Sequence, residues 1–256
     1  MSNILILSPT AISAIAVSRG SGGANLLTDD PKEVWVDSAV STSANIDIDL
    51  GSAKSIDTVF LGYVTPPAAG ATWTITGGTA SYTTTTIKAS GALRAIDSAG
   101  QAPTLSHAFW HGAAVNVRYL RITVTQPAGN PVLSAGIAMA GAAFVPTWNN
   151  EWGAGRRIID TSAVSGLPSG GFAVVQGARK AAYAWTLGDL TQAEVDTLDA
   201  IQRDRGASKP VLVVEDPDAT TGQRNRIHYG LLTSLRQYER RNTQQTKWEF
   251  SLEEWV

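Results

Sequence analysis

Short segments of the chain alternate strictly between apolar and polar residues. In residues 46–50, three apolar side chains fall on one side of an extended strand and Asp47 and Asp49 fall on the other, because successive side chains of a strand point to opposite faces. Residues 117–124 and 247–253 alternate in the same way. This period of two predicts strands with one face on a core and the other in water.

Turn-forming residues separate further short strands in the first 145 residues. Gly51 follows the alternating segment, and we expect it to end that strand. The Thr-rich segment 82–87 favours extended backbone because β-branched side chains fit it, while residues 89–103 have the composition of a long loop. Other strands are expected at residues 4–6, 56–61 and 73–76. Many short strands without a helical period predict a β-sandwich or jelly roll.

One helix is predicted, at residues 192–205. Thr191 and Glu194 have the spacing of a capping box, in which the two side chains satisfy backbone N–H groups at the start of a helix. Val195 and Leu198 recur at helical spacing, and Gly206 stands where a helix-ending glycine belongs. Strands are expected around this helix at residues 172–175, 182–187, 211–214, 227–232 and 247–253. The second half is therefore predicted to be an α+β unit, a small barrel or sandwich that carries one helix.

Charge density divides the chain into two parts. Residues 1–145 contain 7 basic and 8 acidic residues, whereas the shorter segment 146–256 contains 13 and 14. The change falls beside Pro146, Asn149 and Asn150, which interrupt regular structure. We therefore predict two domains, residues 1–145 and residues 146–256.

The overall composition excludes several classes of protein. Hydrophobic residues make up 43% of the chain, which excludes wholesale disorder, and a formal net charge of −2 gives no electrostatic reason to bind nucleic acid. The absence of cysteine excludes disulfides and catalytic thiolates. No apolar run approaches the roughly 20 residues that cross a membrane. Residues 1–7 lack the basic segment and the apolar length of a signal peptide, so none is expected.

No arrangement of reactive residues predicts an enzyme. His107 and His111 have the spacing of a zinc-binding helix, but no glutamate accompanies them and their segment has no helical pattern. Asp160, Glu215 and Asp216 are carboxylates of the kind that a glycosidase needs across a cleft, but no spacing selects them. We therefore predict no catalytic residue, no metal and no cofactor.

The first half resembles the discoidin-like, or coagulation-factor type C, domains. The residues that carry the resemblance are, in order, 25–30, Trp35, the IDIDLG segment 46–51, Ile56, Val59, the RYLRI segment 118–122 and residues 141–144. That family is an eight-stranded jelly roll whose loops at one end bind glycans, lipids or proteins. The resemblance covers about residues 20–145 and implies that Trp35 packs in the core. The family's cysteine pair is absent from this chain, so the resemblance supports the fold of the family better than it supports any of the family's ligands.

Three aromatic residues are the candidates for a surface that stacks on a glycan. Tyr63, Trp73 and Trp110 have rings with the area and polar tip that sugar binding uses. The alternative for each of them is packing in the core.

The second half is similar to tail-tip or minor tail proteins of tailed bacteriophages. The matching segments are short, and they are residues 146–150, Gly153, 169–171, Arg179, the capped helix, 210–217, 228–232 and 250–254. Related domains combine a β-barrel with one helix and build the ring at the end of the tail tube. The resemblance implies a structural protein of the virion tail, made in the host cytoplasm, that assembles as a homo-oligomer with tail-tube, hub or tip proteins.

Two hypotheses about function follow. In the first, residues 146–256 assemble in a ring of the distal tail, while residues 1–145 decorate the ring and bind a host-surface glycan. The ring contacts are interface arginines and the strand at residues 247–253, for which the alternative is a place inside its own sheet. In the second, the chain is a free-standing carbohydrate-binding module or adhesin without an assembly role. Neither includes direct nucleic-acid binding or membrane insertion. The arginines expected at an interface, with a solvated surface as their alternative, are Arg226, Arg236, Arg240 and Arg241.

Overall fold

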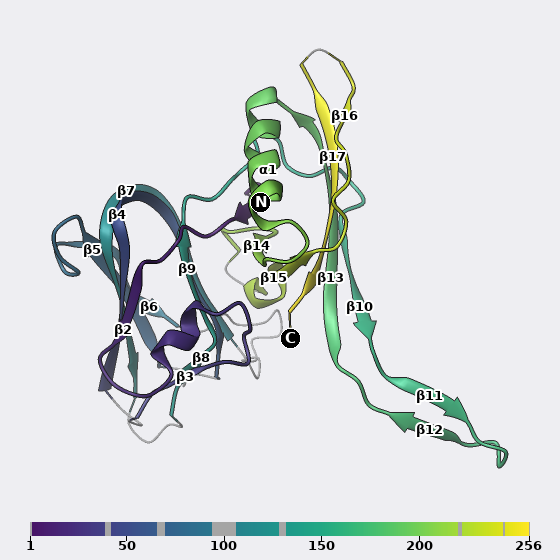
Figure 1. The fold of residues 1–256 in the computed structure, drawn as a ribbon, viewed down its shortest axis with the longest axis horizontal. Coiled ribbons are helices and arrows are strands. Elements are labelled where there is room, and N and C mark those ends of the chain that lie inside the picture. The colour runs from purple at the N-terminus through teal and green to yellow at the C-terminus, as the bar shows by residue number, and fades with distance from the viewer. Residues whose placement is uncertain are drawn as a thin grey trace. The chain divides into compact units, whose positions relative to one another are not determined.

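The computed structural model describes residues 2–38, 42–65, 70–93, 106–127, 132–219, 222–242 and 244–255. In these residues the chain is mainly β, with one α-helix and two short 3-10 helices (Figure 1). The chain divides into two compact units. Unit 1 contains Met1–Val145 and Val213–Ile227, and unit 2 contains Pro146–Leu212 and His228–Val256.

Limited proteolysis tests whether the predicted domains are separable. Thr147, Trp148 and Asn149 are exposed in a segment without regular structure, so we expect a protease to cut there first. Residues 213–227 follow this segment in the sequence but belong to unit 1, so the two fragments should stay associated until they are denatured. A protected chain that yields no fragments of about 145 and 111 residues would contradict separable domains.

Unit 1 is a β-sandwich. Its six-stranded sheet has the order β2-β4-β7-β5-β6, with β9 also paired to β4, and a two-stranded sheet joins β3 to β8. Figure 1 shows the two longest strands, β4 and β7, arching together. The strands are β1 (Leu5–Leu7), β2 (Ala14–Val17), β3 (Trp35–Val36), β4 (Thr42–Val64), β5 (Thr72–Gly78), β6 (Thr85–Ala92), β7 (Ser106–Gln126), β8 (Ser134–Ala135) and β9 (Ile137–Gly141). The 3-10 helices are η1 (Gly23–Leu27) and η2 (Gln223–Arg226).

Strand β4 does not end at Gly51, contrary to the prediction. The backbone of Gly51 has a φ of 75°, and the pairing of β4 with β7 shifts its register between Asp49 and Lys54. Glycine adopts this conformation without steric cost, so it accommodates a bulge that bends the strand and lets it continue. The strands predicted at residues 46–50 and 56–61 are therefore one element.

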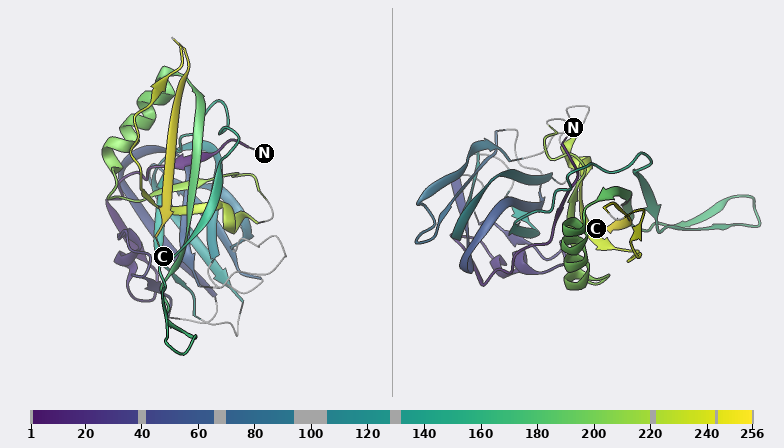
Figure 2. Two further views of the ribbon diagram at one scale, coloured as in Figure 1. Left: turned by 90° about the vertical axis from the view of Figure 1, so that its right-hand side faces the viewer. Right: turned by 90° about the horizontal axis from the view of Figure 1, so that it is seen from above.

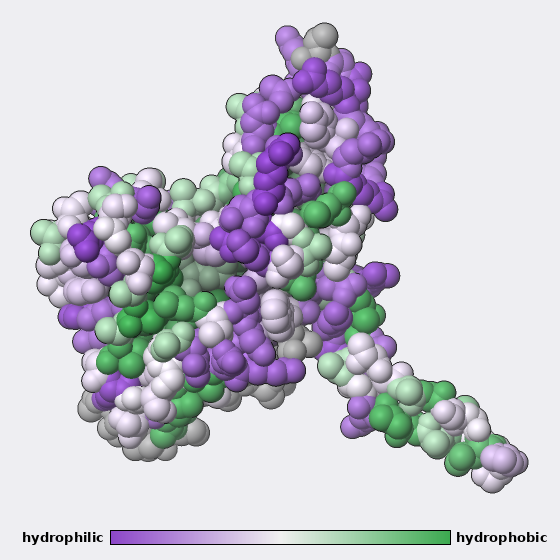
Figure 3. Space-filling view, in the orientation of Figure 1, coloured by the Kyte–Doolittle hydropathy of each residue, from purple (hydrophilic) through white to green (hydrophobic). Residues whose placement is uncertain are grey.

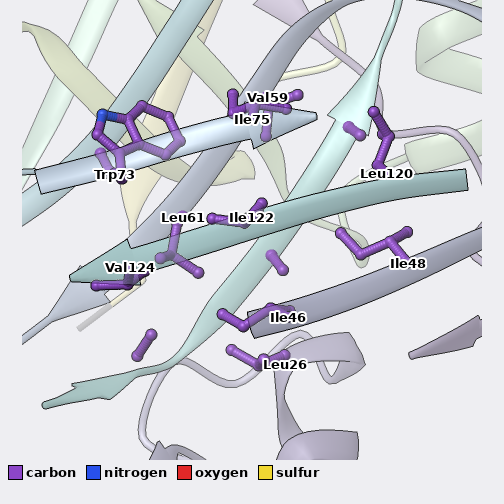
Figure 4. Packing of buried hydrophobic residues seen from close by; sticks show 14 of the residues in the cluster. Leu26, Ile46, Ile48, Val59, Leu61, Trp73, Ile75, Leu120, Ile122 and Val124 are labelled. Carbon is purple, nitrogen blue, oxygen red and sulfur yellow. The ribbon is translucent and has the colours of Figure 1, made fainter. Parts of the chain in front are cut away.

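Alternation along the long strands builds the core of unit 1. Ile46 and Ile48 of β4, and Leu120 and Ile122 of β7, are all fully buried and share one cluster with Leu26 of η1 (Figure 4). Removing each such side chain from water contributes about 1.5–3 kcal/mol. This confirms the inward face predicted for residues 46–50, while in residues 117–124 the period of two holds from Leu120 onward and Val117 is buried as well.

Unit 2 is a sheet with one α-helix and a two-stranded hairpin. Within it the strand order is β15-β17-β13-β10, while β11 pairs with β12 (Figures 1 and 2). The elements are β10 (Gly155–Asp160), β11 (Ala163–Gly166), β12 (Phe172–Val175), β13 (Arg179–Leu190), α1 (Gln192–Arg205), β15 (Ile227–Leu232), β16 (Glu239–Arg240) and β17 (Thr246–Glu254). Strand β14 (Val211–Val214) lies where the chain passes from unit 2 to unit 1. The strands predicted at 172–175, 211–214 and 227–232 are confirmed.

The terminal strand β17 is an interior strand. It pairs with β13 along one side, and with β15 and β16 along the other. Its backbone hydrogen bonds are therefore used within the chain, so this strand is internal to its own sheet, the second of the two alternatives that the sequence leaves open. Trp248, Phe250 and Leu252 are buried, as the alternation predicted.

Helix α1 begins and ends where the sequence predicted. The Thr191 backbone N–H donates to the Glu194 carboxylate at 2.7 Å, and the Glu194 N–H donates back to the Thr191 hydroxyl oxygen at 3.4 Å, which completes the capping box. Burial raises the pKa of Glu194. Hydrogen bonds from the Thr147 and Thr191 backbones and from the Thr191 hydroxyl lower it by more than burial raises it, so the pKa lies below its usual value. No helix in the described residues is long and apolar enough to span a membrane.

Substitution Thr191→Ala is expected to destabilise unit 2 by about 1 kcal/mol, because it removes the side-chain acceptor for an N-terminal amide of α1. Chemical denaturation followed by circular dichroism measures the change. The conservative variant Thr191→Ser keeps the acceptor and should lie close to the wild type. An alanine variant with an unchanged midpoint would show that the cap does not stabilise this helix.

Candidate functional site

Two of the three aromatic residues predicted to stack on a glycan lie in the core. Trp73 of β5 is 2% exposed, because β5 alternates and points Trp73 and Ile75 inward. The ammonium group of Lys88 lies 4.9 Å from the centroid of the Trp73 ring, and burial lowers the pKa of Lys88. Trp73 therefore offers no ring to a ligand, and its predicted role is corrected to packing.

Tyr63 and Trp110 also pack within unit 1. Tyr63 is 9% exposed and has a φ of 54°, its N–H donates to Nδ1 of His107 at 3.1 Å, and its ring meets the His107 ring edge-on. Trp110 of β7 is half-buried against the core cluster, opposite Val59 of β4. Tyr63 is thus corrected to a core residue, while Trp110 keeps only a partly exposed ring.

The largest exposed rings are ones that the sequence reasoning did not propose. Trp148 is 66% exposed and Trp152 is fully exposed, in the segment that precedes β10. The sequence indicates this exposure only indirectly: Pro146 and the two asparagines nearby interrupt regular structure, so neither tryptophan belongs to an alternating strand. Both rings therefore lie on the surface of unit 2.

The outer face of the sheet in unit 1 carries the most organised group of polar side chains. Strand register sets Asp47 opposite Arg121 and Asp49 opposite Tyr119. The Arg121 guanidinium donates to both oxygens of Asp47 at 2.6 and 2.7 Å. The Arg118 guanidinium donates to both oxygens of Asp49 at 2.9 and 3.0 Å. Such two-point pairs hold the planar groups in fixed orientation.

Two tyrosines lie between these ion pairs. The rings of Tyr82 and Tyr119 meet edge-on with centroids 5.0 Å apart. The Arg118 guanidinium lies 4.7 Å from the Tyr119 centroid, and that of Arg121 lies 5.5 Å from the Tyr82 centroid. We call this group the ladder face, and its six residues are Asp47, Asp49, Tyr82, Arg118, Tyr119 and Arg121.

The contacts within the ladder face favour the ionised forms of Asp49, Arg118 and Arg121. Hydrogen bonds from Arg118 and from the Gly51 backbone N–H lower the pKa of Asp49. The hydrogen bonds to Asp49 and Asp47 raise the pKa of Arg118 and Arg121 respectively. Burial raises the pKa of the Tyr82 hydroxyl, and the nearby carboxylates add to the effect. The face therefore presents two guanidinium–carboxylate pairs beside two tyrosine rings.

The ladder face has unused hydrogen-bonding capacity. All six side chains are half-buried, so each also reaches solvent. Among the described residues, Arg118 and Arg121 donate through Nε and one Nη only, which leaves further N–H groups on both. Rings, guanidinium donors and carboxylate acceptors in one row match the hydroxyl groups and apolar faces of a sugar chain.

The histidines do not form a metal site. His107 and His111 lie on strand β7 and not on a helix, so four residues separate them by about 13 Å. His107 is buried beside Phe60 and Tyr63, and Nδ1 of His111 lies 3.0 Å from the Thr58 hydroxyl. In the described part of the chain, no three His, Cys, Asp or Glu side chains gather closely enough to hold a metal ion.

Three of the four predicted interface arginines donate side-chain hydrogen bonds within their own chain. Arg236 donates to Glu249, Arg240 to the Gln192 side chain at 2.7 Å, and Arg241 to Glu151 at 2.7 Å. The Arg226 carbonyl accepts from the Glu215 N–H at 2.9 Å at the end of η2. All but the half-buried Arg226 are exposed, which fits the solvated-surface alternative.

Two of the three carboxylates considered for catalysis accept hydrogen bonds from nearby side chains. Asp160 accepts from Arg179 at 2.9 Å in unit 2. Asp216 accepts from the Ser2 hydroxyl at 2.8 Å in unit 1. The Glu215 backbone N–H bonds to the carbonyl of Arg226. Asp160 therefore lies in a different unit from Glu215 and Asp216.

Comparison with known proteins gives likenesses of fold. No protein-family model and no curated protein matches the chain. The CBM32 module of AlyQ, solved in complex with 4,5-unsaturated mannuronic acid, is 22% identical with a TM-score of 0.39, and the match covers 52% of this chain and 98% of that module. Chitosan-binding module 1 of the chitosanase/glucanase from Paenibacillus sp. IK-5 is 15% identical with a TM-score of 0.42, and the match covers 53% of this chain and 100% of that module.

A third solved structure, CBM32-3 of a family 31 glycoside hydrolase from Clostridium perfringens, is 18% identical with a TM-score of 0.41, and the match covers 54% of this chain and 94% of that module. Each of the three matches covers about half of this chain and nearly all of the matched module. The similarity to tail proteins stays a prediction from the sequence.

Proposed function

We propose that unit 1 is a non-catalytic glycan-binding module and that the ladder face is its binding surface. The observation that supports this most is the interleaving of two tyrosine rings with two guanidinium–carboxylate pairs on a half-exposed sheet face. Neighbours in fold include modules described as binding chitosan or solved with an unsaturated mannuronic acid. Because these neighbours are at most 22% identical to this chain, they suggest only the general class of ligand, a glycan.

A neutral glycan suits the ladder face better than a charged one. Its two aspartates and two arginines cancel in charge and already pair with each other, so an acidic sugar gains little attraction there. Sugar hydroxyl groups can both donate to the carboxylates and accept from the remaining guanidinium N–H groups. The rings of Tyr82 and Tyr119 add apolar contact for the face of a sugar.

Affinity electrophoresis against neutral and acidic polysaccharides tests the proposal. The full chain should be retarded by at least one neutral polysaccharide, with little dependence on salt, because no net charge steers the binding. Reducing ends should not accumulate over the same period, because the module does not cut its ligand. Retention by acidic polymers alone, with a steep salt dependence, or release of sugars that one Asp→Asn or Glu→Gln variant abolishes, would overturn the proposal.

A second candidate function is that of a structural protein of a bacteriophage distal tail. Here unit 2 assembles with tail-tube, hub or tip proteins in the virion, and unit 1 decorates the tail and binds a glycan of the host surface. The specific observation in its favour is an uncharged, exposed hairpin in unit 2, of the kind that assembly surfaces carry. Immunogold labelling of virions tests it: label at the tail tip supports the role, and intact tail tips in virions that lack the protein contradict it.

A further inference from the structure

A two-stranded hairpin, residues 161–178, extends strands β10 and β13 away from the rest of unit 2 (Figures 1 and 2). We call it the arm. Strand β11 pairs with β12, with Val164 opposite Val174 and Gly166 opposite Phe172. A turn closes the tip, where the Leu167 N–H donates to the Gly171 carbonyl at 2.8 Å.

The arm exposes apolar side chains on both faces. Phe172 is 74% exposed, Val175 71%, Val164 61% and Val174 58%. Phe172 and Val174 point to one face and Val175 to the other, because side chains alternate along a strand. Figure 3 shows the arm as a mostly hydrophobic projection. A free two-stranded hairpin is marginally stable in water, so an apolar one of this kind is expected to be covered by a partner.

The base of the arm is fixed by polar contacts. Arg179 donates to Asp160 at 2.9 Å, the Ser162 N–H donates to Asp160 at 2.9 Å, and the Thr161 N–H donates to the Ala178 carbonyl at 3.1 Å. The Ser162 hydroxyl accepts from the Gly177 N–H at 2.9 Å. These contacts set the direction in which the arm leaves the sheet.

The carboxylate at the arm base should titrate far below the usual range of an aspartate. Hydrogen bonds from Ser162, then from Arg179, lower the pKa of Asp160 to about 2. A depressed pKa in the folded state means that the contribution of Asp160 to stability is present above its unfolded pKa near 4 and is lost as the pH falls toward 2. Carboxyl NMR shifts should give a midpoint near 2, moving toward 4 in Arg179→Gln. A midpoint near 4 in the wild type would contradict the contacts.

A pocket of about 350 Å³ lies at the base of the arm, within unit 2. Thr161 and Ala178, the first and last residues of the arm, form part of its wall, and Leu231 and Trp255 supply apolar surface. The ion pair of Lys180 with Glu253, at 2.6 Å, also lines it. The pocket and the exposed Phe172 thus stand at opposite ends of the same hairpin.

We propose that the arm of one copy packs along the arm of a second copy of this chain, with Phe172 of each tip entering the pocket at the other's base. When two identical arms lie antiparallel, each tip meets the base of the other arm, so the same contact between tip and pocket forms twice. Residues 161–178 contain no charged side chain, although unit 2 is the charged part of the chain, so identical arms approach without repulsion. Each copy contributes the 18 residues of its arm and six further residues that line its pocket, 24 in all, which is within the roughly 20–30 residues a side of a standard interface. This inference does not depend on glycan binding.

Native mass spectrometry and light scattering of the full chain, over a range of concentrations, test the proposal. The wild type should be a dimer, and the double variant Phe172→Ser/Val174→Asp should be a monomer that keeps the far-UV circular dichroism spectrum of the folded chain, because both side chains are exposed in a single copy. The matched control Leu27→Ser changes another exposed apolar residue, in unit 1, and should remain a dimer. A monomeric wild type, or a dimer unaffected by the double variant, would overturn the proposal. A larger closed ring that needs the arm would overturn the antiparallel pairing.

Crosslinking tests the contact itself, because the chain has no cysteine of its own. Two single variants, Phe172→Cys and Thr233→Cys, place one thiol at the tip and one at the pocket. Mixing them under mild oxidation should give a crosslinked heterodimer. Replacing Thr233→Cys by the exposed control Gln244→Cys should give at least about tenfold less product. Equal yields would overturn the assignment of the pocket.

Discussion

Substitution Trp35→Ala is expected to destabilise unit 1 by about 3–5 kcal/mol, the usual cost of removing a large aromatic side chain from a core. Trp35 is fully buried in the cluster that contains Leu26 and Ala135. Its indole N–H donates to the carbonyl of Arg19 at 3.1 Å, so alanine both leaves a cavity and removes a partner from that carbonyl. A loss of this size is a large fraction of the stability of an ordinary domain.

Denaturant unfolding followed by far-UV circular dichroism measures the loss. The matched control is Trp152→Ala, which removes the same side chain from a fully exposed position and should change the free energy of unfolding by less than about 0.5 kcal/mol. Trp35→Phe keeps most of the packing and should fall between the two. Similar midpoints for Trp35→Ala and Trp152→Ala would show that Trp35 does not organise the core.

Substitution Tyr119→Ala is expected to weaken glycan binding at least about tenfold, which corresponds to about 1.4 kcal/mol. Tyr119 lies at the centre of the ladder face, between the Arg118 guanidinium and the Tyr82 ring. Its loss removes apolar contact area and also leaves Arg118 without the ring that holds its guanidinium plane. Central aromatic and arginine residues carry most of the energy of binding surfaces.

Isothermal titration with the best neutral oligosaccharide gives the affinity. Tyr119→Phe keeps the ring and should lose less than the alanine variant, which separates stacking from hydroxyl contacts. Tyr238→Ala changes a tyrosine of unit 2 outside the ladder face and should bind as the wild type does. Equal affinities for Tyr119→Ala and Tyr238→Ala would remove the ladder face from the binding surface.

The sequence predicts the strands of this protein where one face of the strand is buried. The inward positions at Ile46, Ile48 and Ile122 follow from a period of two, and the ends of α1 follow from Thr191 and Gly206. Local chemistry decides these features, so they need no knowledge of the partner strands. The prediction that Gly51 ends its strand is wrong, because a glycine after an alternating segment ends a strand in some folds and bends it in others.

The candidate binding surface was less accessible to sequence reasoning. Alternation places Arg118 on the face opposite Tyr119, yet the register shift after Asp49 brings both side chains to the ladder face. Asp47 and Asp49 were expected as solvated carboxylates, and only the pairing of β4 with β7 shows that arginines hold them. A contact across about 70 residues of sequence leaves no local signature.

The arm was missed in part for a related reason. The sequence predicts the strand at residues 172–175 but not β10 or β11, because residues 155–160 do not alternate and residues 161–171 are rich in glycine and serine. Apolar residues in a strand usually predict burial, whereas Phe172 and Val174 are exposed. Such a mismatch between hydrophobicity and burial becomes visible only in the folded chain.

A crystal structure of the chain with a bound neutral oligosaccharide tests the central proposal most directly. We expect the sugar to lie across Tyr82 and Tyr119, with hydroxyl groups within hydrogen-bond distance of the Arg118 and Arg121 guanidinium groups. Sugar bound instead at the exposed Trp148 and Trp152, or at loops of the sandwich with the ladder face empty, would contradict it.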